Sequence, residues 1–236
     1  MLDVIASISA LTREFETITH NMANAGTVGY KRRSNAFSKS LETNGEYSAG
    51  NEDLSSMFDF SQGSTVETGR PLDLALFGKG FFAVETPDGP LYTRNGMFST
   101  NQNGQIVDSI GRIVAGQSGP ITIPGNVGIS QLYVAGDGTI SAGSTTLGKL
   151  RLVDFEGNEN KLVPTGDSSY RMPDETIIPV AAQHMVIKQG YQEASNVKII
   201  EELVDMIFVT RLYEANVKSI TAQQEASSTL MSAAMG

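Results

Sequence analysis

The chain has 236 residues, and its 17 lysines and arginines stand against 26 aspartates and glutamates, which gives a formal net charge of −9. This acidic balance argues against a nucleic-acid partner, because the phosphate backbone binds clustered lysines and arginines. It also favours a soluble chain over one that binds a membrane surface. The chain has no cysteine, which excludes disulfides, thiolate metal sites and thiol nucleophiles. No apolar run approaches the roughly 20 residues of a membrane span.

The N-terminal segment carries the apolar repeat of one helix face. Apolar side chains recur at alternating steps of four and three, with mostly polar residues between them. The helix is expected to end near Gly26, where glycine can supply a left-handed cap. The segment lacks the basic start, the apolar block and the cleavage site of a secretory signal. The predicted seam positions are Val4, Ile8, Leu11, Phe15, Ile18 and Met22.

The C-terminal segment carries a similar repeat, interrupted at Thr210. Ser195 or Asn196 is a suitable N-cap for a helix roughly 55 Å long. An aspartate at Leu203 is expected to bury an unpaired charge in this seam. The seam positions are Ile199, Leu203, Met206, Tyr213, Val217 and Ile220, with further apolar surface from Ile200, Val204, Ile207 and Phe208. We expect the two terminal helices to pair, although such patterns also suit two ordinary core helices of a globule.

Residues 34–65 are rich in serine, asparagine, glutamate and glycine, and they have no clear period. This segment is predicted to be an extended linker that orders only against something else. An apolar island at residues 57–60 interrupts it. The basic run at residues 31–33, just before it, is either a solvated corner or a contact with an acidic neighbour.

Residues 66–188 contain short apolar runs separated by glycine and asparagine turns, ending in a predicted strand from His184 to Lys188. This spacing is typical of an antiparallel sandwich or an irregular barrel. The predicted fold class is therefore α+β. Residues 1–33 and 189–236 are expected to form a terminal, coiled-coil-like α-helical hairpin, with the linker and an all-β antiparallel domain at 66–188 inserted between them.

The sequence shows no pattern that indicates catalysis, a metal or a cofactor. His20 and His184 have no ligand-type neighbours at metal spacing, and Gly78-Lys79-Gly80 lacks the rest of a phosphate loop. A hydrolase would need a pair among the aspartates, whose separation is invisible in sequence. A carbohydrate-binding β module with a helical oligomerisation tail would need exposed aromatic rings. The residues concerned are Asp73, Asp88, Asp108, Asp137 and Asp154 for the first alternative, and Phe81, Phe82, Tyr92 and Phe98 for the second.

Three motifs resemble those of the flagellar basal-body rod and hook proteins. The first is THNMANAGTVGYK at residues 19–31. The second is GRPLDLALFGKGFF at residues 69–82, followed by YTRNG at residues 92–96. The third spans Gln189-Gly190, Ser195-Asn196-Val197, Met206-Ile207, Arg211–Ala215 and Lys218. Within this family the middle of the chain is most similar to the proximal rod protein, with the distal rod protein as the second choice and a hook-type axial subunit also possible.

The resemblance implies an axial subunit of the bacterial flagellum, not an enzyme. Such subunits are exported by the flagellar type III apparatus without a cleaved signal, and they assemble in the periplasm into a hollow rod. The implied partners are neighbouring rod proteins, including the distal rod, and the export apparatus, with no nucleic acid and no membrane insertion. The predicted assembly interface comprises both helical seams together with Asn24, Tyr30 and Lys31.

Overall fold

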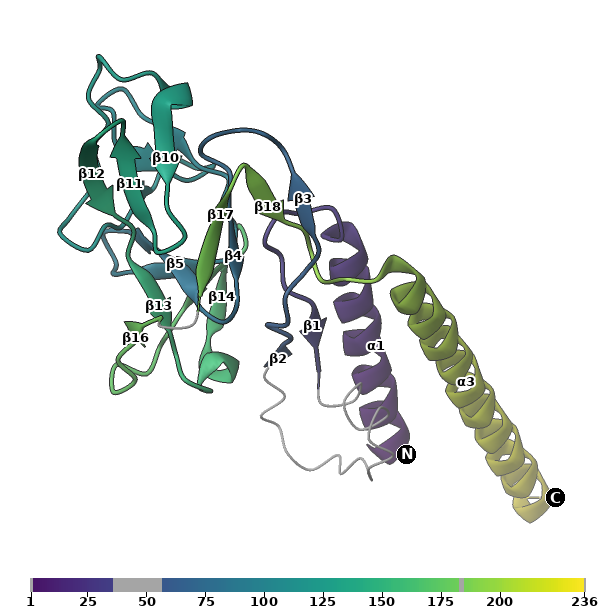
Figure 1. The fold of residues 1–236 in the computed structure, drawn as a ribbon. Coiled ribbons are helices and arrows are strands. Elements are labelled where there is room, and N and C mark those ends of the chain that lie inside the picture. The colour runs from purple at the N-terminus through teal and green to yellow at the C-terminus, as the bar shows by residue number, and fades with distance from the viewer. Residues whose placement is uncertain (1, 36–56, 183–184, 236) are drawn as a thin grey trace. The chain divides into compact units, whose positions relative to one another are not determined.

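The computed structural model describes residues 2–35, 57–182 and 185–235, and it shows a mixed helix-and-sheet chain with a large antiparallel β region (Figure 1). The chain divides into two compact units. A helical unit is formed from residues 1–24, 32–59 and 197–236, and a β unit from residues 25–31 and 60–196.

Within the described residues, the helical unit contains two long helices and one short antiparallel strand pair. The elements are α1 (Leu2–Ala23), β1 (Arg33–Ser34), β2 (Met57–Phe58) and α3 (Ile199–Met235). Leu11 and Ile18 of α1 share a small apolar core with Val209 of α3. Met22, Met206 and Leu212 pack against this core while remaining partly exposed. The Arg33 guanidinium lies over the Phe58 ring, 5.7 Å from its centroid, so one side chain of the apolar island packs in this unit.

The β unit is built entirely from antiparallel strand pairs. Its main sheet has the order β14-β15-β6-β5-β9-β8-β7, and β13 joins it by pairing with β5 and β16. The other pairings are β10-β11-β12, β17-β4 and β18-β3. The main-sheet strands are β5 (Phe81–Glu85), β6 (Leu91–Thr93), β7 (Ser99–Thr100), β8 (Ile106–Val107), β9 (Ile113–Val114), β13 (Leu152–Asp154), β14 (Val163–Gly166), β15 (Ser169–Arg171) and β16 (Val180–Ala181). The remaining strands are β3 (Thr65–Glu67), β4 (Leu74–Phe77), β10 (Leu132–Val134), β11 (Thr139–Ala142), β12 (Thr145–Lys149), β17 (Val186–Gln189) and β18 (Tyr191–Glu193).

Several aromatic side chains of the β unit pack in its interior. Phe82 packs edge-on against Phe98, and Tyr92 against Phe155. Phe60, from the apolar island, lies edge-on to the buried Phe81 with ring centroids 5.3 Å apart. The four rings that a carbohydrate-binding surface would expose, Phe81, Phe82, Tyr92 and Phe98, are at most 4% exposed. They therefore cannot form a stacking platform for a sugar.

The segment that enters α3 differs from the expectation. The predicted last strand, His184 to Lys188, is found as β17 from Val186, and His184 lies outside the described residues. A further strand, β18, follows it, because Tyr191–Glu193 pairs with Thr65–Glu67 of β3. The predicted N-caps Ser195 and Asn196 lie before the helix, which begins at Ile199. Asn196 instead donates its Nδ2 to the Ser61 carbonyl and hydroxyl oxygens.

Candidate assembly interface

The face of α3 that packs on α1 is not the predicted apolar row. Among the described side chains of α3, Glu202 and Val209 are buried, and Met206, Leu212 and Asn216 are partly buried between or beyond them. This row lies one position before most of the predicted seam, which corresponds to a rotation of about 100° around the helix axis. The predicted seam residues are largely exposed, with Ile199 at 51%, Leu203 at 43%, Tyr213 at 44% and Val217 at 37%, whereas Met206 and Ile220 are partly buried.

This rotation changes what an aspartate at Leu203 would do. Leu203 is not in the subunit core, so the expectation that Leu203→Asp buries a charge within the chain is wrong. An aspartate at this position would instead place a charge on the exposed surface of α3.

The predicted seam of α1 agrees better with the observed contacts. Leu11 and Ile18 are buried, Ile8 and Met22 are partly buried, and Phe15 is 44% exposed. The side chain of Val4 lies outside the described residues. Asn24, at the end of the helix, donates its Nδ2 to the His20 carbonyl at 2.9 Å. Partial desolvation of the His20 ring, followed by the charge of Arg33, lowers the pKa of His20 below the usual 6.5.

A polar cluster lies within the contact between the two helices. The side chain of Glu202 is fully buried, and its carboxylate accepts Nδ2 of Asn21 at 3.2 Å and Nε of Arg32 at 2.5 Å. Arg32 also reaches Asp205, at 3.5 Å. The acidic neighbour suggested for the basic run thus exists, and it belongs to the same chain. We call Asn21, Arg32 and Glu202 the helix cluster.

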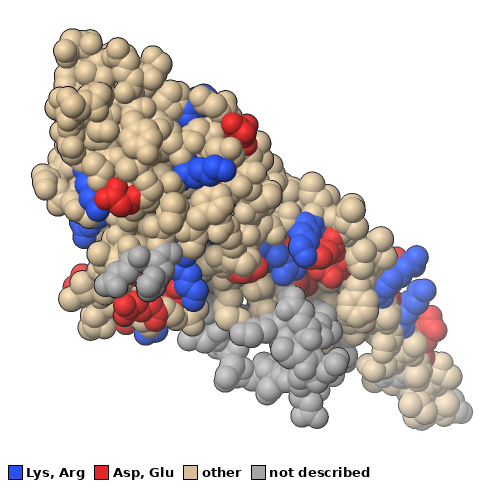
Figure 2. Space-filling model, in the orientation of Figure 1, with Lys and Arg blue, Asp and Glu red and all other residues tan. Residues whose placement is uncertain are grey.

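The exposed surface of the first turns of α3 carries several apolar side chains. Six side chains form this surface, which we call the α3 apolar face: Ile199, Ile200, Leu203, Val204, Ile207 and Phe208. Ile200 is 78% exposed and Ile207 is 64% exposed. Figure 2 shows that the charged side chains visible in that view lie in small mixed groups of both signs. A group of exposed apolar side chains is a candidate surface for packing against another protein.

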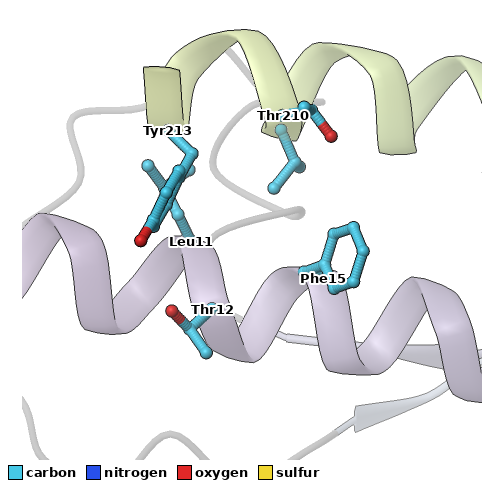
Figure 3. A pocket seen from close by; sticks show the side chains of 6 residues that line it. Leu11, Thr12, Phe15, Thr210 and Tyr213 are labelled. Atoms are coloured by element: carbon cyan, nitrogen blue, oxygen red, sulfur yellow. The ribbon is translucent and has the colours of Figure 1, made fainter. Parts of the chain in front are cut away.

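A groove runs beside this contact, between the middle of α1 and α3. It has a volume of about 290 Å³ and is lined by Leu11, Thr12, Phe15, Val209, Thr210 and Tyr213. Figure 3 shows the Phe15 ring standing toward α3 and the Tyr213 ring lying beside Leu11. Because most of the lining is apolar, the groove suits an apolar side chain rather than a polar ligand.

Tyr30 and Lys31 do not lie on a surface, contrary to the assignment made from the first motif. Both are buried in the β unit. Lys31 Nζ lies 2.7 Å from Oε1 of Glu193 and donates to the Ser61 carbonyl at 2.6 Å. The Glu193 carboxylate also accepts the Gly63 amide at 3.1 Å and Arg94 Nη1 at 3.3 Å. We call Lys31, Arg94 and Glu193 the β cluster.

The β cluster brings the three sequence motifs together. Lys31 ends the first, Arg94 belongs to the second, and Glu193 lies between the residues of the third. The Gly29 amide also donates to the backbone carbonyl of Glu193, at 2.7 Å. Gly29 has φ +67°, and a Cβ there would stand 2.3 Å from the Asn95 nitrogen, so only glycine fits. Burial lowers the pKa of Arg94, although the charge of Glu193 opposes this shift.

Two of the aspartates considered for hydrolysis bind neighbouring side chains of the β unit. Asp73 accepts the Thr68 hydroxyl and the Gln192 amide, and Asp108 pairs with Arg112 at 2.6 Å. Within the described residues, no three histidine, cysteine or acidic side chains are grouped so as to hold a metal ion. Over the same part of the chain, none of the helices combines the length and the apolar character needed to cross a membrane.

Comparison with known proteins decides the family. Residues 75–142 match the model of the flagellar hook protein FlgE/F/G D1 domain, and residues 188–233 match that of the flagellar basal body rod FlgEFG protein C-terminal region. The chain is 33% identical over 222 residues to the flagellar basal-body rod protein FlgF of Mesorhizobium japonicum, covering 93% of this chain and 90% of that protein. It belongs to the flagellar basal-body rod protein family.

Relatives named FlgF and relatives named FlgG match this chain at comparable sequence identity. The FlgG protein of Buchnera aphidicola from Acyrthosiphon pisum is 35% identical over 88% of this chain and 89% of its own length. The FlgF protein of Salmonella typhimurium is 34% identical over 87% and 86%. Membership in this family makes the chain a structural protein of the flagellar basal body, where the rod lies. It does not separate the proximal from the distal position in that rod.

Proposed function

We propose that this rod protein polymerises through its terminal helices into the hollow shaft of the basal body. α1 and α3 of one chain form a coiled-coil-like hairpin, and the α3 apolar face of each subunit packs on the helices of its neighbours. The observation that carries the proposal is the exposure of six apolar side chains over the first turns of α3. Burying one such side chain is worth about 1.5–3 kcal/mol, so leaving all of them in water is costly for an isolated chain.

The groove between α1 and α3 supplies a matching surface. Its apolar lining can take a side chain from the α3 apolar face of an adjacent subunit. The donating face and the receiving groove are different surfaces, so the contact is heterologous and need not close into a ring. Repetition of such a contact produces a helical assembly.

The remaining details follow from the family resemblance. We propose a place in the proximal rod, with the distal rod or a hook-type axial position as the alternative. Export through the flagellar type III apparatus, with no cleaved signal, would deliver the subunit to the periplasm. Its neighbours there would be other rod proteins.

The test is the substitution Leu203→Asp in the chromosomal copy, with Leu203→Met as the matched control. Leu203 lies on the exposed side of α3, so the aspartate leaves the fold of the free subunit unchanged while placing a charge in the subunit contact. We expect the aspartate variant to be non-motile and absent from purified basal bodies, and the methionine variant to be motile. Normal motility and incorporation of the aspartate variant would refute the proposal.

A further inference from the structure

The helix cluster places a buried charge beside the apolar core residues Leu11, Ile18 and Val209. Glu202 has no exposed side-chain surface, and it lies in the same row as Met206 and Val209. A buried carboxylate is stable only when hydrogen bonds and a counter-charge replace water. Asn21 and Arg32 provide them from two segments, the end of α1 and the chain just after it.

Asn21 is itself fixed in place. Its Oδ1 accepts the backbone amide of Arg33 at 2.8 Å, and its Nδ2 donates to the Arg33 carbonyl at 2.8 Å and to Glu202. Arg33 belongs to β1, which pairs with β2. Sliding α3 along α1 would therefore leave the Glu202 carboxylate buried without its partners, and Asn21 could not follow it.

The apolar part of the contact does not select one alignment. Leu11 and Ile18 are seven residues apart in α1, as are Phe15 and Met22. A heptad row presents similar side chains after each shift of seven, so α3 could slide by one heptad and still find apolar partners. Glu14 occupies the heptad position of Asn21 one repeat earlier and is also buried. A slip in that direction would place Glu202 opposite Glu14, and two buried carboxylates would repel each other.

We propose that the helix cluster is the register determinant of the α1–α3 pair, with Glu202 as the specificity-determining residue. Apolar packing holds the helices together, and the buried charge permits one alignment. A single buried polar residue is known to fix alignment in coiled coils at some cost in stability. If the proposed function holds, this alignment also decides which apolar side chains of α3 face a neighbouring subunit.

The test traps the alignment by chemical cross-linking of the full-length chain. The chain has no cysteine, so an introduced pair is the only source of thiols. Thr12→Cys with Tyr213→Cys reports the observed alignment, because both residues line the groove. Thr12→Cys with Met206→Cys and Thr19→Cys with Tyr213→Cys report slips of seven residues in the two directions. A short bis-maleimide captures each pair within one chain, and circular dichroism follows the helical content.

Each pair is made in the parent chain, in Glu202→Leu and in a matched control, Glu214→Leu, whose carboxylate is exposed and pairs with Arg211. We expect the parent and the control to form at least ten times more of the aligned product than of either slipped product. In Glu202→Leu, at unchanged helical content, this ratio should fall to threefold or less. Glu202→Gln, which retains an acceptor and carries no charge, should keep the ratio above threefold.

Three results would overturn the proposal. The first is an aligned product that still dominates at least tenfold in Glu202→Leu. The second is a loss of helical content and of all products in that variant, which would show that Glu202 is needed for pairing rather than for alignment. The third is a parent chain without the aligned product. None of these depends on rod assembly, so a motile Leu203→Asp strain would refute the proposed function and leave this inference standing.

Discussion

Lys31 and Glu193 are 162 positions apart in the chain, and their Nζ and Oε1 atoms lie 2.7 Å apart with neither side chain exposed. This ion pair joins the first motif to the third. The Gly29 amide and the Glu193 carbonyl, at 2.7 Å, form a second link between the same two segments. In the β unit, the first and third motif segments are therefore held together where the chain enters this unit and where it leaves it.

Removing one partner of this pair should strongly destabilise the β unit. Lys31→Met leaves the Glu193 carboxylate buried with a weaker set of partners, and the loss of one member of a buried ion pair typically costs about 3–5 kcal/mol. Urea denaturation followed by fluorescence of the tyrosines measures the change. Lys149→Met is the matched control, because its pair with Asp137 is exposed at 38% and 57% and should contribute less than about 1 kcal/mol. Equal losses in the two variants would show that burial does not matter here.

Gly29 should not tolerate a side chain. In Gly29→Ala, the positive φ and the approach to the Asn95 backbone act together, so we expect a loss of more than about 3 kcal/mol. Gly111→Ala is the control, since Gly111 has φ +90° but no atom within 4 Å of an added Cβ. This variant should lose only the free energy that the left-handed backbone conformation costs an alanine, about 1–2 kcal/mol. Thermal denaturation compares them, and similar melting temperatures would contradict the close contact.

Asp137 should give the β unit a stability increment that disappears in acid. Hydrogen bonds from Lys149 and then from Thr139 lower its pKa from 3.8 to about 2. A carboxylate whose pKa is lower in the folded state stabilises the fold above its unfolded pKa, and this contribution is lost as the pH falls toward the folded value. The melting temperature of Asp137→Asn should therefore lie below that of the parent at pH 7. The difference should shrink between about pH 4 and pH 2, and a constant difference across that range would exclude the linkage.

The two units should differ in local stability in the free subunit. Among the described side chains, the core shared by α1 and α3 contains three buried apolar residues, Leu11, Ile18 and Val209, whereas the β unit has a large core. Hydrogen exchange should therefore be fast in both helices and slow in the main sheet. The pair still forms often enough to be trapped by a cross-linker. Equal protection of α3 and β5 in the monomer would contradict this expectation.

The sequence predicted the α+β composition, and its β part followed from local signals. A strand such as Phe81–Val84 and the turn before Leu91 can be recognised from adjacent residues alone. The strands β5 and β6 lie where these local signals predict them. The face of α3 was predicted wrongly because periodicity treats a charged residue as solvent-exposed. Glu202 is buried, and its partners are 170 and 181 positions away. No local pattern connects residues so distant.

The same limit applies to the basic run at residues 31–33. Charge alone predicted either a solvated corner or a contact with an acidic residue. In the structure, neighbouring residues of this run pair with different glutamates. Lys31 is buried beside Glu193, and Arg32 is directed to Glu202. Their places in the first motif singled these residues out, but a motif does not say whether a residue faces a partner or the interior. Burial of Lys31 settles that point against the surface.

The central claim is that neighbouring subunits cover the α3 apolar face in the rod. Ile207→Cys tests it most directly, because Ile207 is 64% exposed in the free chain and the chain has no other thiol. We predict that a maleimide labels this cysteine rapidly in the purified subunit and at least tenfold more slowly in intact basal bodies, with full labelling after denaturation. Equal labelling rates in the free subunit and in the basal body would contradict the account.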